Sequence, residues 1–563
     1  MFDPNNIRLN QARMEKNRST HDRYWTEIAA LCYPELESFQ GGQMKQSPWM
    51  RNQVRSVGSH DPYTVEAVQD GVSLFESYVM PRGQRWQKLA LGDEELMKDV
   101  EVLQWLEKVE IRLFGLRNDP ESGFVANIHD SAMSLFTFGP QSLWVDDRYD
   151  DYGRWAGLRY ESEYIGDIWV ERDASGRIIR IHRRIVMTAE QAHIKWGAKA
   201  PELVRKAMEG NAKNQQQEFE FLHVIERNTK MDANRIDAAG KPWLGCYYSV
   251  SDNAVFDIGG YHSLPRLVSS FRRPGNVTYG RSPAMTALPL IRKCMQIDWD
   301  RSLGAELRLL PPLLTADNEL DNAVLELRAL GVTEGGLNDR GEPLVKEFLT
   351  QSDANDAEKL YAEARQLEDK IFFRDMLQLD REYKSHIPAA RIEEERSEKG
   401  ILLAPLSMQE AEWLSPMTAR EMTLMARHGM MDDMPDKVKA YLHAQGTLGL
   451  KYDNGLTQLQ EAGKSAAFLS VAGQIGSLAQ FNPQYVEFFN REYPPEKVIT
   501  ELGRIAGIPA SMRSTEEERA AFDQQQAQKA QLDQLLAAAP ALAGAAKDAA
   551  AAGQPMPSGM MGA

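Results

Sequence analysis

The chain has 563 residues, more than a single hydrophobic core usually serves, so several lobes are expected. Hydrophobic residues make up 43% of it and charged residues 26%, which fits a folded globular protein and excludes collagen-like or grossly disordered chains. The formal net charge of −16 excludes a protein whose whole surface holds nucleic acid through phosphate contacts, so any DNA partner is expected to be held loosely.

The sequence predicts no membrane contact, metal or cofactor. The N-terminal stretch is polar and lacks the apolar core of a signal peptide, and no later run reaches the roughly 18–20 apolar residues of a membrane span. Cys32, Cys246 and Cys294 are far apart and form no C-x-x-C pair, which indicates a reducing compartment. The ten histidines show no H-E-x-x-H motif, so a zinc enzyme is not expected.

The N-terminal part, from about residue 11 to 116, has a helical pattern. Helices are expected over "RYWTEIAALCYPEL", "TVEAVQDGVSLFESYVM", about 93–117, and 124–138. Pro81 is expected to end the second of these helices.

Between about residues 140 and 273 the pattern becomes that of strands. The run "IGDIWVERDASGRIIRIHRRIVM" predicts a hairpin that turns at Asp173-Ala174-Ser175-Gly176. Later runs are expected to extend the same antiparallel lobe: "EFEFLHVIERN", "LGCYYSVS" and "RLVSSFR". A helical insertion, "TAEQAHIKWGAKAPELVRKAMEG", separates them from the hairpin.

Two long helices are expected in the second half of the chain. The first covers about 282–310, with the apolar stripe Ala284, Leu288, Ile291, Met295, Trp299, Leu303 and Leu307. Pro289 lies inside it, which predicts either a kink or a later start. The second covers about 355–377, with Leu360, Ala364, Leu367 and Ile371 on one face. Together they predict an antiparallel hairpin that carries a small module at its tip.

The C-terminal part is expected to be helical from about 389 to 428, with breaks at Pro405 and Pro416. The end of the chain is rich in Gln and Ala and then in Gly, Pro and Met. It predicts a helix that frays into a disordered tail.

The stretch "NVTYGRSPAM" has two interpretations. Gly280-Arg281-Ser282 after an extended run resembles the elbow that presents a catalytic serine in α/β-hydrolases. That elbow needs a backbone N–H from the residue after the serine, and Pro283 has none. The favoured interpretation is a helix start, in which Gly280 allows the turn, Ser282 caps the helix and Pro283 is its first residue.

Two other motifs favour ordinary surface structure over chemistry. Gly463-Lys464-Ser465 resembles part of a phosphate loop, but Gln458 stands where the earlier glycine is needed. The aspartates of "VDDRYDDYGRW" could hold a divalent cation, but they lack calcium-loop spacing and more often form a solvated turn.

Basic residues gather in and beside "QLDREYKSHIPAA", after the second long helix. They are Arg374, Arg381, Lys384, His386 and Arg391. Such a cluster is usually solvated surface, and it matters for function only if this loop faces a phosphate backbone.

The order and spacing of several stretches resemble the portal proteins, or head-to-tail connectors, of tailed bacteriophages, particularly the short-tailed ones. The stretches are "DRYWTEIAALCYPE", "EAVQDGVSLFESYVMPRGQRWQKL", "SLFTFGPQSLWVDD", "TYGRSPAMTALPLIRKCMQID" and "RIEEERSEKGILLAPLSMQEAEWLSPMTAREMTLMARHG". The fourth resembles the junction from the β-rich wing of that family into its first stem helix, at Gly280, Ser282 and Pro283.

The resemblance implies a mainly helical α+β fold with an α/β wing, a two-helix stem, a small clip module and a helical crown. The implied domains are a wing over 1–281 (β-rich over about 140–273), a first stem helix over 282–310, a clip over 311–353, a second stem helix over 354–377, a channel loop over 378–390, wing and crown helices over 391–515, and a Gln/Ala-rich helix with a disordered tail over 516–563.

The resemblance also implies a non-enzymatic function. The expected protein is a homo-oligomeric ring, typically dodecameric, at one capsid vertex of the virion, assembled in the host cytoplasm. Double-stranded DNA would pass through it, touched lightly by Arg374, Arg381, Lys384, His386 and Arg391. The implied protein partners are the terminase large subunit, the major capsid protein, the scaffolding protein and tail adaptors. The alternatives are another head-tail adaptor and, remotely, a serine hydrolase.

Overall fold

A computed structural model describes residues 2–36, 62–309 except 233 and 276, 313–314, 332–333, 340–342, 354–376, 404–445 and 448–452, together with short pieces between 468 and 529. The chain divides into two compact units. The first comprises residues 1–87, 110–432 and 452–471, and the second comprises 88–109, 433–451 and 472–563. The mixed α+β class predicted from the sequence is confirmed.

The helices at the start of the first unit follow local signals. Helix α1 (Pro4–Cys32) begins where Asp3 accepts a hydrogen bond from the Asn5 amide, with proline in the first turn. Helix α2 spans Pro62–Val79, just before the predicted stop at Pro81. Helix α4 spans Phe124–Phe138, the predicted range, and lies between Gly123 and Gly139, which both have positive φ. Helix α3 (Val100–Asn118) contributes its last residues to this unit.

Five antiparallel strands form the larger sheet, in the order β4 (Ile168–Arg172), β5 (Ile178–Thr188), β6 (Glu218–Arg227), β7 (Trp243–Ser249) and β8 (Ala254–Tyr261). The predicted hairpin is confirmed. The Gly176 N–H closes the β4–β5 turn by donating to the Asp173 carbonyl oxygen at 3.0 Å.

Alternation along β6 assigns the two faces of this sheet. Leu222 and Val224 pack with Ile7 of α1 on one face. Phe219 and Phe221 point to the other face and pack with Trp196, in the predicted helical insertion. That insertion forms α5 (Ala189–Trp196), α6 (Glu202–Met208) and α7 (Ala212–Gln215).

A second sheet of three strands corrects one prediction. The run "RLVSSFR" forms β9 (Arg266–Ser270), which pairs not with the larger lobe but with β2 (Pro140–Tyr149), itself paired with β3 (Trp155–Ser162). All five β9 residues are buried, so its hydrophobic pattern carried no information about which sheet it joins.

A buried ionic cluster connects the two sheets. Glu163, which follows β3, accepts hydrogen bonds from Arg266 of β9 (2.5 and 3.0 Å) and from Arg183 of β5 (2.7 Å). Ser142 of β2 donates to the same carboxylate at 2.9 Å. Glu163 and Arg266 have fully buried side chains, so each charge depends on the other for compensation.

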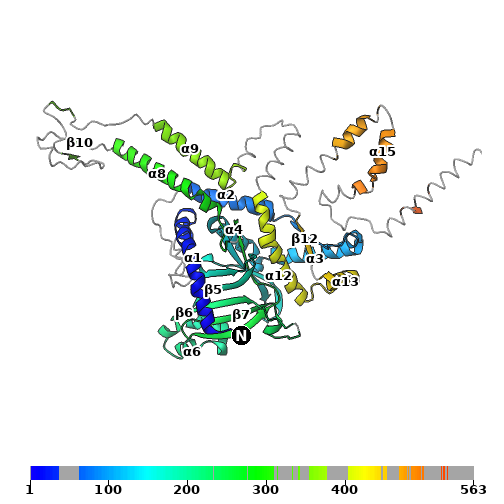
Figure 1. Ribbon diagram of the computed structural model, residues 1–563, viewed down its shortest axis with the longest axis horizontal. Helices are drawn as coiled ribbons and strands as arrows, with labels where there is room; N and C mark the ends of the chain where they lie inside the picture. The colour runs from blue at the N-terminus through cyan, green and yellow to red at the C-terminus, as the bar shows by residue number, and fades with distance from the viewer. Residues whose placement is uncertain are drawn as a thin grey trace, which may run out of the picture. The chain divides into compact units, whose positions relative to one another are not determined.

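The two long helices are present and pack against each other (Figure 1). Helix α8 spans Pro283–Leu309, and α9 spans Ala354–Ile371. Pro289 lies inside α8 without ending it. Between them, the described part of the tip contains a parallel pair of short strands, β10 (Leu313–Leu314) and β11 (Val332–Thr333).

The buried face of α9 agrees only in part with the predicted one. Ala364 is buried and Ile371 packs against the core, as predicted, but Leu360 and Leu367 are 46% and 49% exposed. Arg365, Glu368 and Asp369 are buried instead. The reason is a polar seam with α2: Thr64 donates to Glu368 (2.7 Å) and Tyr63 donates to Asp369 (2.7 Å). Arg365 completes the seam by donating to Glu368 at 2.7 Å. A hydropathy pattern could not find a face whose charges satisfy one another.

The helical region predicted over 389–428, which the structure describes from residue 404, also departs from the prediction. A π-helical turn at Glu410–Leu414 (η10) leads into α12 (Ser415–Arg427). Pro416 does not break the helix, because it occupies the first turn of α12. The predicted break at Pro405 falls in a 3-10 turn, Ala404–Ser407.

The second unit has its own contacts. Strands β1 (Gln87–Ala90) and β12 (Gly449–Tyr452) pair, so the purely helical prediction for residues 11–116 is wrong at 87–90. Tyr441 of α13 (Asp436–Gln445) accepts from the Gly92 amide at 2.8 Å, and Lys437 pairs with Asp99 at 2.6 Å. Helix α15 spans Gln484–Glu492. The predicted C-terminal tail lies almost wholly outside the described residues.

Candidate functional site

The junction from the smaller sheet to helix α8 runs from the end of β9 to the start of α8. Its two arms meet at a bridge between Arg272 and Arg281, with Arg281 N–H donating to Arg272 O at 2.8 Å. Gly280 is required here because a Cβ at this position would lie 2.6 Å from the Ser270 Cβ and 2.7 Å from the Arg272 carbonyl oxygen.

An aromatic cluster supports the residue before Gly280. Trp25 of α1 is fully buried and donates its Nε1–H to the Phe138 carbonyl at 2.8 Å. Its ring packs edge-on against Tyr279, with centroids 5.5 Å apart, and against Phe138. The cluster therefore fixes the junction to both α1 and the end of α4.

Ser282 is a helix cap, as predicted. Its Oγ accepts from the Met285 amide at 2.8 Å and its hydroxyl donates to the Thr137 carbonyl at 2.8 Å. The side chain is buried, and its proton is already bonded to a carbonyl oxygen that cannot serve as a general base. Gly280, Ser282 and Pro283 thus act together in turning the chain into α8.

Replacing Ser282 by Ala is expected to lower the free energy of unfolding by about 0.5–2 kcal/mol, because the Met285 amide loses its acceptor. Chemical denaturation would measure the change. The control is Ser77→Ala, which removes a hydroxyl from an exposed position within α2. Equal effects of the two substitutions would contradict the capping role.

Polar contacts join α8 and α9 away from the sheet. Asp298 of α8 accepts from the Tyr361 hydroxyl of α9 at 3.1 Å and lies 3.7 Å from Arg365. Arg301 lies over the Tyr361 ring, 5.5 Å from its centroid. Of the predicted α8 stripe, Ala284, Leu288 and Ile291 are buried, whereas Trp299 and Leu303 are 66% and 42% exposed. Leu307 lies among the residues whose side chains are not described.

Of the five basic candidates for DNA contact, the structure describes only Arg374. Its guanidinium pairs with Asp70 (2.8 Å) and Glu66 (3.4 Å) of α2 and lies over the Tyr63 ring. Burial alone would lower the pKa of Arg374, but the surrounding acidic groups, Asp70 first, raise it. Arg381, Lys384, His386 and Arg391 lie outside the described residues.

The aspartate cluster is used for structure. Asp146 pairs with Arg420 of α12 at 3.0 Å, and Asp150 accepts from the amides of its own turn, Tyr152 and Arg154. Asp147 accepts from the Trp155 indole at 3.0 Å. Within the described residues, no three His, Cys, Asp or Glu side chains gather in a way that could hold a metal ion. The phosphate-loop-like Gly463-Lys464-Ser465 lies outside the described residues.

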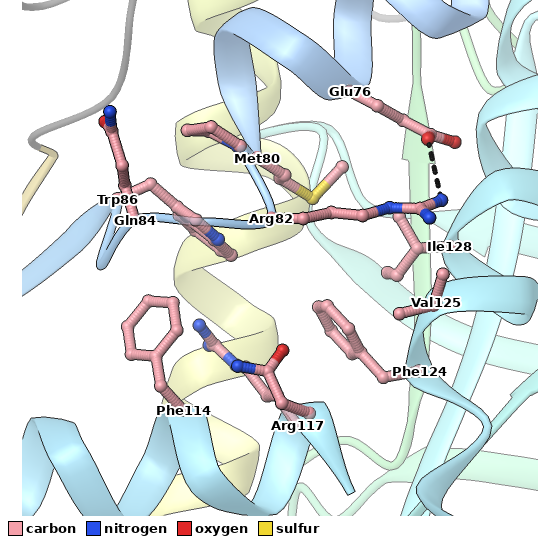
Figure 2. Close-up of a pocket in the computed structure, with 12 residues that line it drawn as sticks. Glu76, Met80, Arg82, Gln84, Trp86, Phe114, Arg117, Phe124, Val125 and Ile128 are labelled. Atoms are coloured by element: carbon pink, nitrogen blue, oxygen red, sulfur yellow. Dashed lines mark ion pairs between the residues drawn. The ribbon is translucent and has the colours of Figure 1, made fainter. Parts of the chain in front are cut away.

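A small cavity lies between α2, α3 and α4, beside Arg117 (Figure 2). Figure 2 shows Trp86, Phe114 and Phe124 around the Arg117 guanidinium, whose carbon is 4.8, 5.0 and 5.8 Å from the three ring centroids. Glu421 of α12 neutralises this buried charge through two hydrogen bonds. The cavity volume of about 30 Å³ has room for one or two water molecules and none for a substrate.

Comparison with known proteins identifies the family. The model of the family described as bacteriophage head to tail connecting protein matches residues 6–513. The chain belongs to this family. The chain is 23% identical to the portal protein of Salmonella phage epsilon15, over 95% of this chain and 93% of the relative. It is 23% identical to the probable portal protein of Bordetella phage BPP-1 over 79% of both chains.

Membership of the head-to-tail connecting family confirms the resemblance found in the sequence. Among the residues that the structure describes, no helix combines the length and apolar composition needed to cross a bilayer. Sequence reasoning missed the anchoring of Arg374 and the buried face of α9, although "DPYTVEAVQDG" does hold several acidic and hydroxyl groups at helical spacing.

Proposed function

We propose that this chain is a phage portal protein, which forms a ring at one capsid vertex and lets DNA enter and leave the head. The carrying observation is the match over 95% of this chain and 93% of the portal protein of phage epsilon15. A shorter head-tail adaptor would not align with nearly the whole length of a portal protein. A serine hydrolase lacks support because the Ser282 proton is bonded to a carbonyl oxygen.

In this proposal the parts of the chain keep the roles that the resemblance implies. Residues 1–281 form the wing, α8 and α9 the stem, 311–353 the clip, 378–390 the channel loop, and helices after 391 the remainder of the wing and the crown. The ring is typically dodecameric. The role is structural, and the protein resides in the virion after assembly in the host cytoplasm.

Exposed apolar side chains on the stem hairpin support ring formation. Trp299, Leu303, Leu360 and Leu367 are each more than 40% exposed on helices that already pack against each other. Trp299 and Leu303 lie one turn apart on α8 and so form one exposed apolar patch, and such patches mark interaction surfaces. Neighbouring subunits in a closed ring would cover them.

Electron micrographs of the purified full-length chain are expected to contain closed rings with a central channel. The variant Trp299→Asp/Leu303→Asp should shift the population toward smaller species, with Tyr152→Asp, at an 84% exposed position outside the stem, as control. A wild-type chain that stays monomeric at high concentration would count against the whole proposal.

The basic residues after α9 are proposed to touch DNA lightly. In an acidic protein, a few cations let a polyanion slide, whereas each added phosphate contact must be broken at each step. Arg381, Lys384, His386 and Arg391 are proposed for this role, whereas Arg374 is paired with Asp70 and Glu66 of α2.

Replacing Arg381 and Lys384 by Gln should weaken the salt dependence of DNA passage in a packaging assay, since fewer counterions are exchanged. Arg23→Gln/Arg159→Gln removes the same charge from exposed positions elsewhere. An unchanged salt dependence in the loop variant would refute the DNA contact.

The proposed protein partners are the terminase large subunit, tail adaptors, the major capsid protein and the scaffolding protein. The clip is proposed as the docking surface for terminase and adaptors. A deletion of residues 311–352 that leaves rings intact but abolishes terminase binding would support this assignment, and unaffected binding would refute it.

A further inference from the structure

One end of the five-stranded sheet carries a groove of about 530 Å³. The strands are antiparallel, so one end of the sheet brings together the end of β4, the start of β5, the end of β6 and the start of β7. Arg172, Arg177 and Arg227 line the groove from these strand ends, and Arg273 lines it from the chain after β9. Four arginines, the first and last of them 101 residues apart in the chain, are therefore brought into one place.

The charge of the groove is opposite to that of the chain. The chain as a whole carries −16, but the groove contains four arginines and one carboxylate, Glu412 of the π-helical turn. That carboxylate is paired with Arg273, whose Nη2 and Nε donate to it at 2.7 and 3.1 Å. Within the described part of the chain, Arg172, Arg177 and Arg227 have no ion-pair partner.

Arg172 is the most constrained of these arginines. Its Nη1 donates to the Gly176 carbonyl at 3.0 Å, whereas its buried Nε and Nη2 have no hydrogen-bond partner among the described residues. Burial, followed by the nearby Arg273, lowers the pKa of Arg172 to about 10, so the group stays charged at neutral pH. The Nε–Nη2 edge is the pair of parallel donors that matches the two oxygens of a carboxylate.

The rest of the lining distinguishes between classes of anion. Ile178, Pro242 and Trp243 form an apolar wall beside the arginines. Contacts to a nucleic-acid backbone need positive charge and hydrogen-bond donors, not an apolar wall. Arginine next to tryptophan and aliphatic groups is instead typical of the centre of protein–protein interfaces.

We propose that this groove binds an acidic peptide segment of a protein partner, with its carboxylates on Arg172, Arg177 and Arg227 and an apolar side chain against the Trp243 wall. The volume of the groove suits a few side chains rather than a folded surface. The proposal does not depend on ring formation.

Fluorescence anisotropy with the full-length chain tests the proposal. The probe is a fluorescein-labelled peptide, Glu-Glu-Leu-Phe-Glu-Glu, compared with its counterpart in which Gln replaces each Glu. We expect saturable binding of the acidic peptide and at least tenfold weaker binding of the Gln peptide. Arg177→Gln/Arg227→Gln, at two exposed positions that should not affect folding, is expected to weaken binding of the acidic peptide at least tenfold.

Two further variants make the result specific. Arg23→Gln/Arg159→Gln removes the same charge outside the groove and should change the affinity less than twofold. Arg172→Lys keeps the charge but lacks the two-donor edge, so it should weaken binding severalfold.

Three results would overturn the proposal. The first is the absence of saturable binding below about 1 mM, a weak limit for a specific contact. The second is an equal loss in the groove and control variants, which would indicate unspecific charge attraction. The third is tighter binding of a twelve-nucleotide oligothymidine that depends on the same arginines, which would make the groove a nucleic-acid site.

Discussion

Replacing Glu163 by Gln is expected to lower the free energy of unfolding by about 3–5 kcal/mol. The substitution keeps an acceptor for Ser142 but leaves the fully buried Arg266 without its counter-charge. Guanidinium unfolding followed by tryptophan fluorescence measures the change. Glu209→Gln, at an exposed position of the same unit, is the control.

The same substitution should alter the acid sensitivity of the protein. Burial would raise the pKa of Glu163, but Arg183 and Arg266 overcome it and hold the pKa below the ordinary value of 4.5. A lowered carboxyl pKa gives stability that is fully present above pH 4.5 and is lost as the pH falls through the folded-state value. The Gln variant should therefore lose less stability below pH 4.5 than the wild type. Parallel acid profiles, or a loss under 1 kcal/mol at neutral pH, would contradict the role of the cluster.

Replacing Trp25 by Ala is expected to lower the free energy of unfolding by about 3–5 kcal/mol. The change leaves a cavity between Tyr279 and Phe138 and removes the donor to the Phe138 carbonyl. Denaturation midpoints measure the effect on stability. Because Trp25 supports the junction into α8, the Ala variant should also form fewer rings.

Two variants separate the contributions of Trp25. Trp25→Phe keeps most of the ring and loses only the indole donor, so its cost should be clearly smaller than that of Ala. Tyr152→Ala removes an aromatic ring that is 84% exposed and should change stability little. An effect of Trp25→Ala as small as that of Tyr152→Ala would refute the packing argument.

Features with local causes were predictable from the sequence. Gly123 and Gly139 bound α4, and Ser282 followed by Pro283 marks the start of α8, because caps and positive φ depend on neighbouring residues. The β4–β5 hairpin follows from its turn residues for the same reason.

Features decided by distant pairing were not predictable. The assignment of β9 to β2 rather than to β8 depends on tertiary contacts, and so does the pairing of β1 with β12, which is more than 350 residues away in the chain. The exposure of Leu360 and Leu367 on α9 has the same origin, because the burial of Glu368 depends on hydrogen bonds from Thr64 and Arg365.

The candidate site divides in the same way. The role of Ser282 follows from adjacent residues, whereas the ion pairs of Arg374 with Asp70 and Glu66 cross 300 residues of sequence. The arginine groove appears only once four strand ends are aligned by their registers.

The polar seam between α9 and α2 has a mechanical consequence. Ion pairs and hydrogen bonds weaken steeply when their partners shift by an ångström or two, whereas apolar surfaces tolerate sliding. The bonds of Glu368, Asp369 and Arg374 with α2 therefore resist shear along α9. We therefore expect a force applied along the hairpin to be carried into α2 and the core around it, with the base of α9 and α2 moving together.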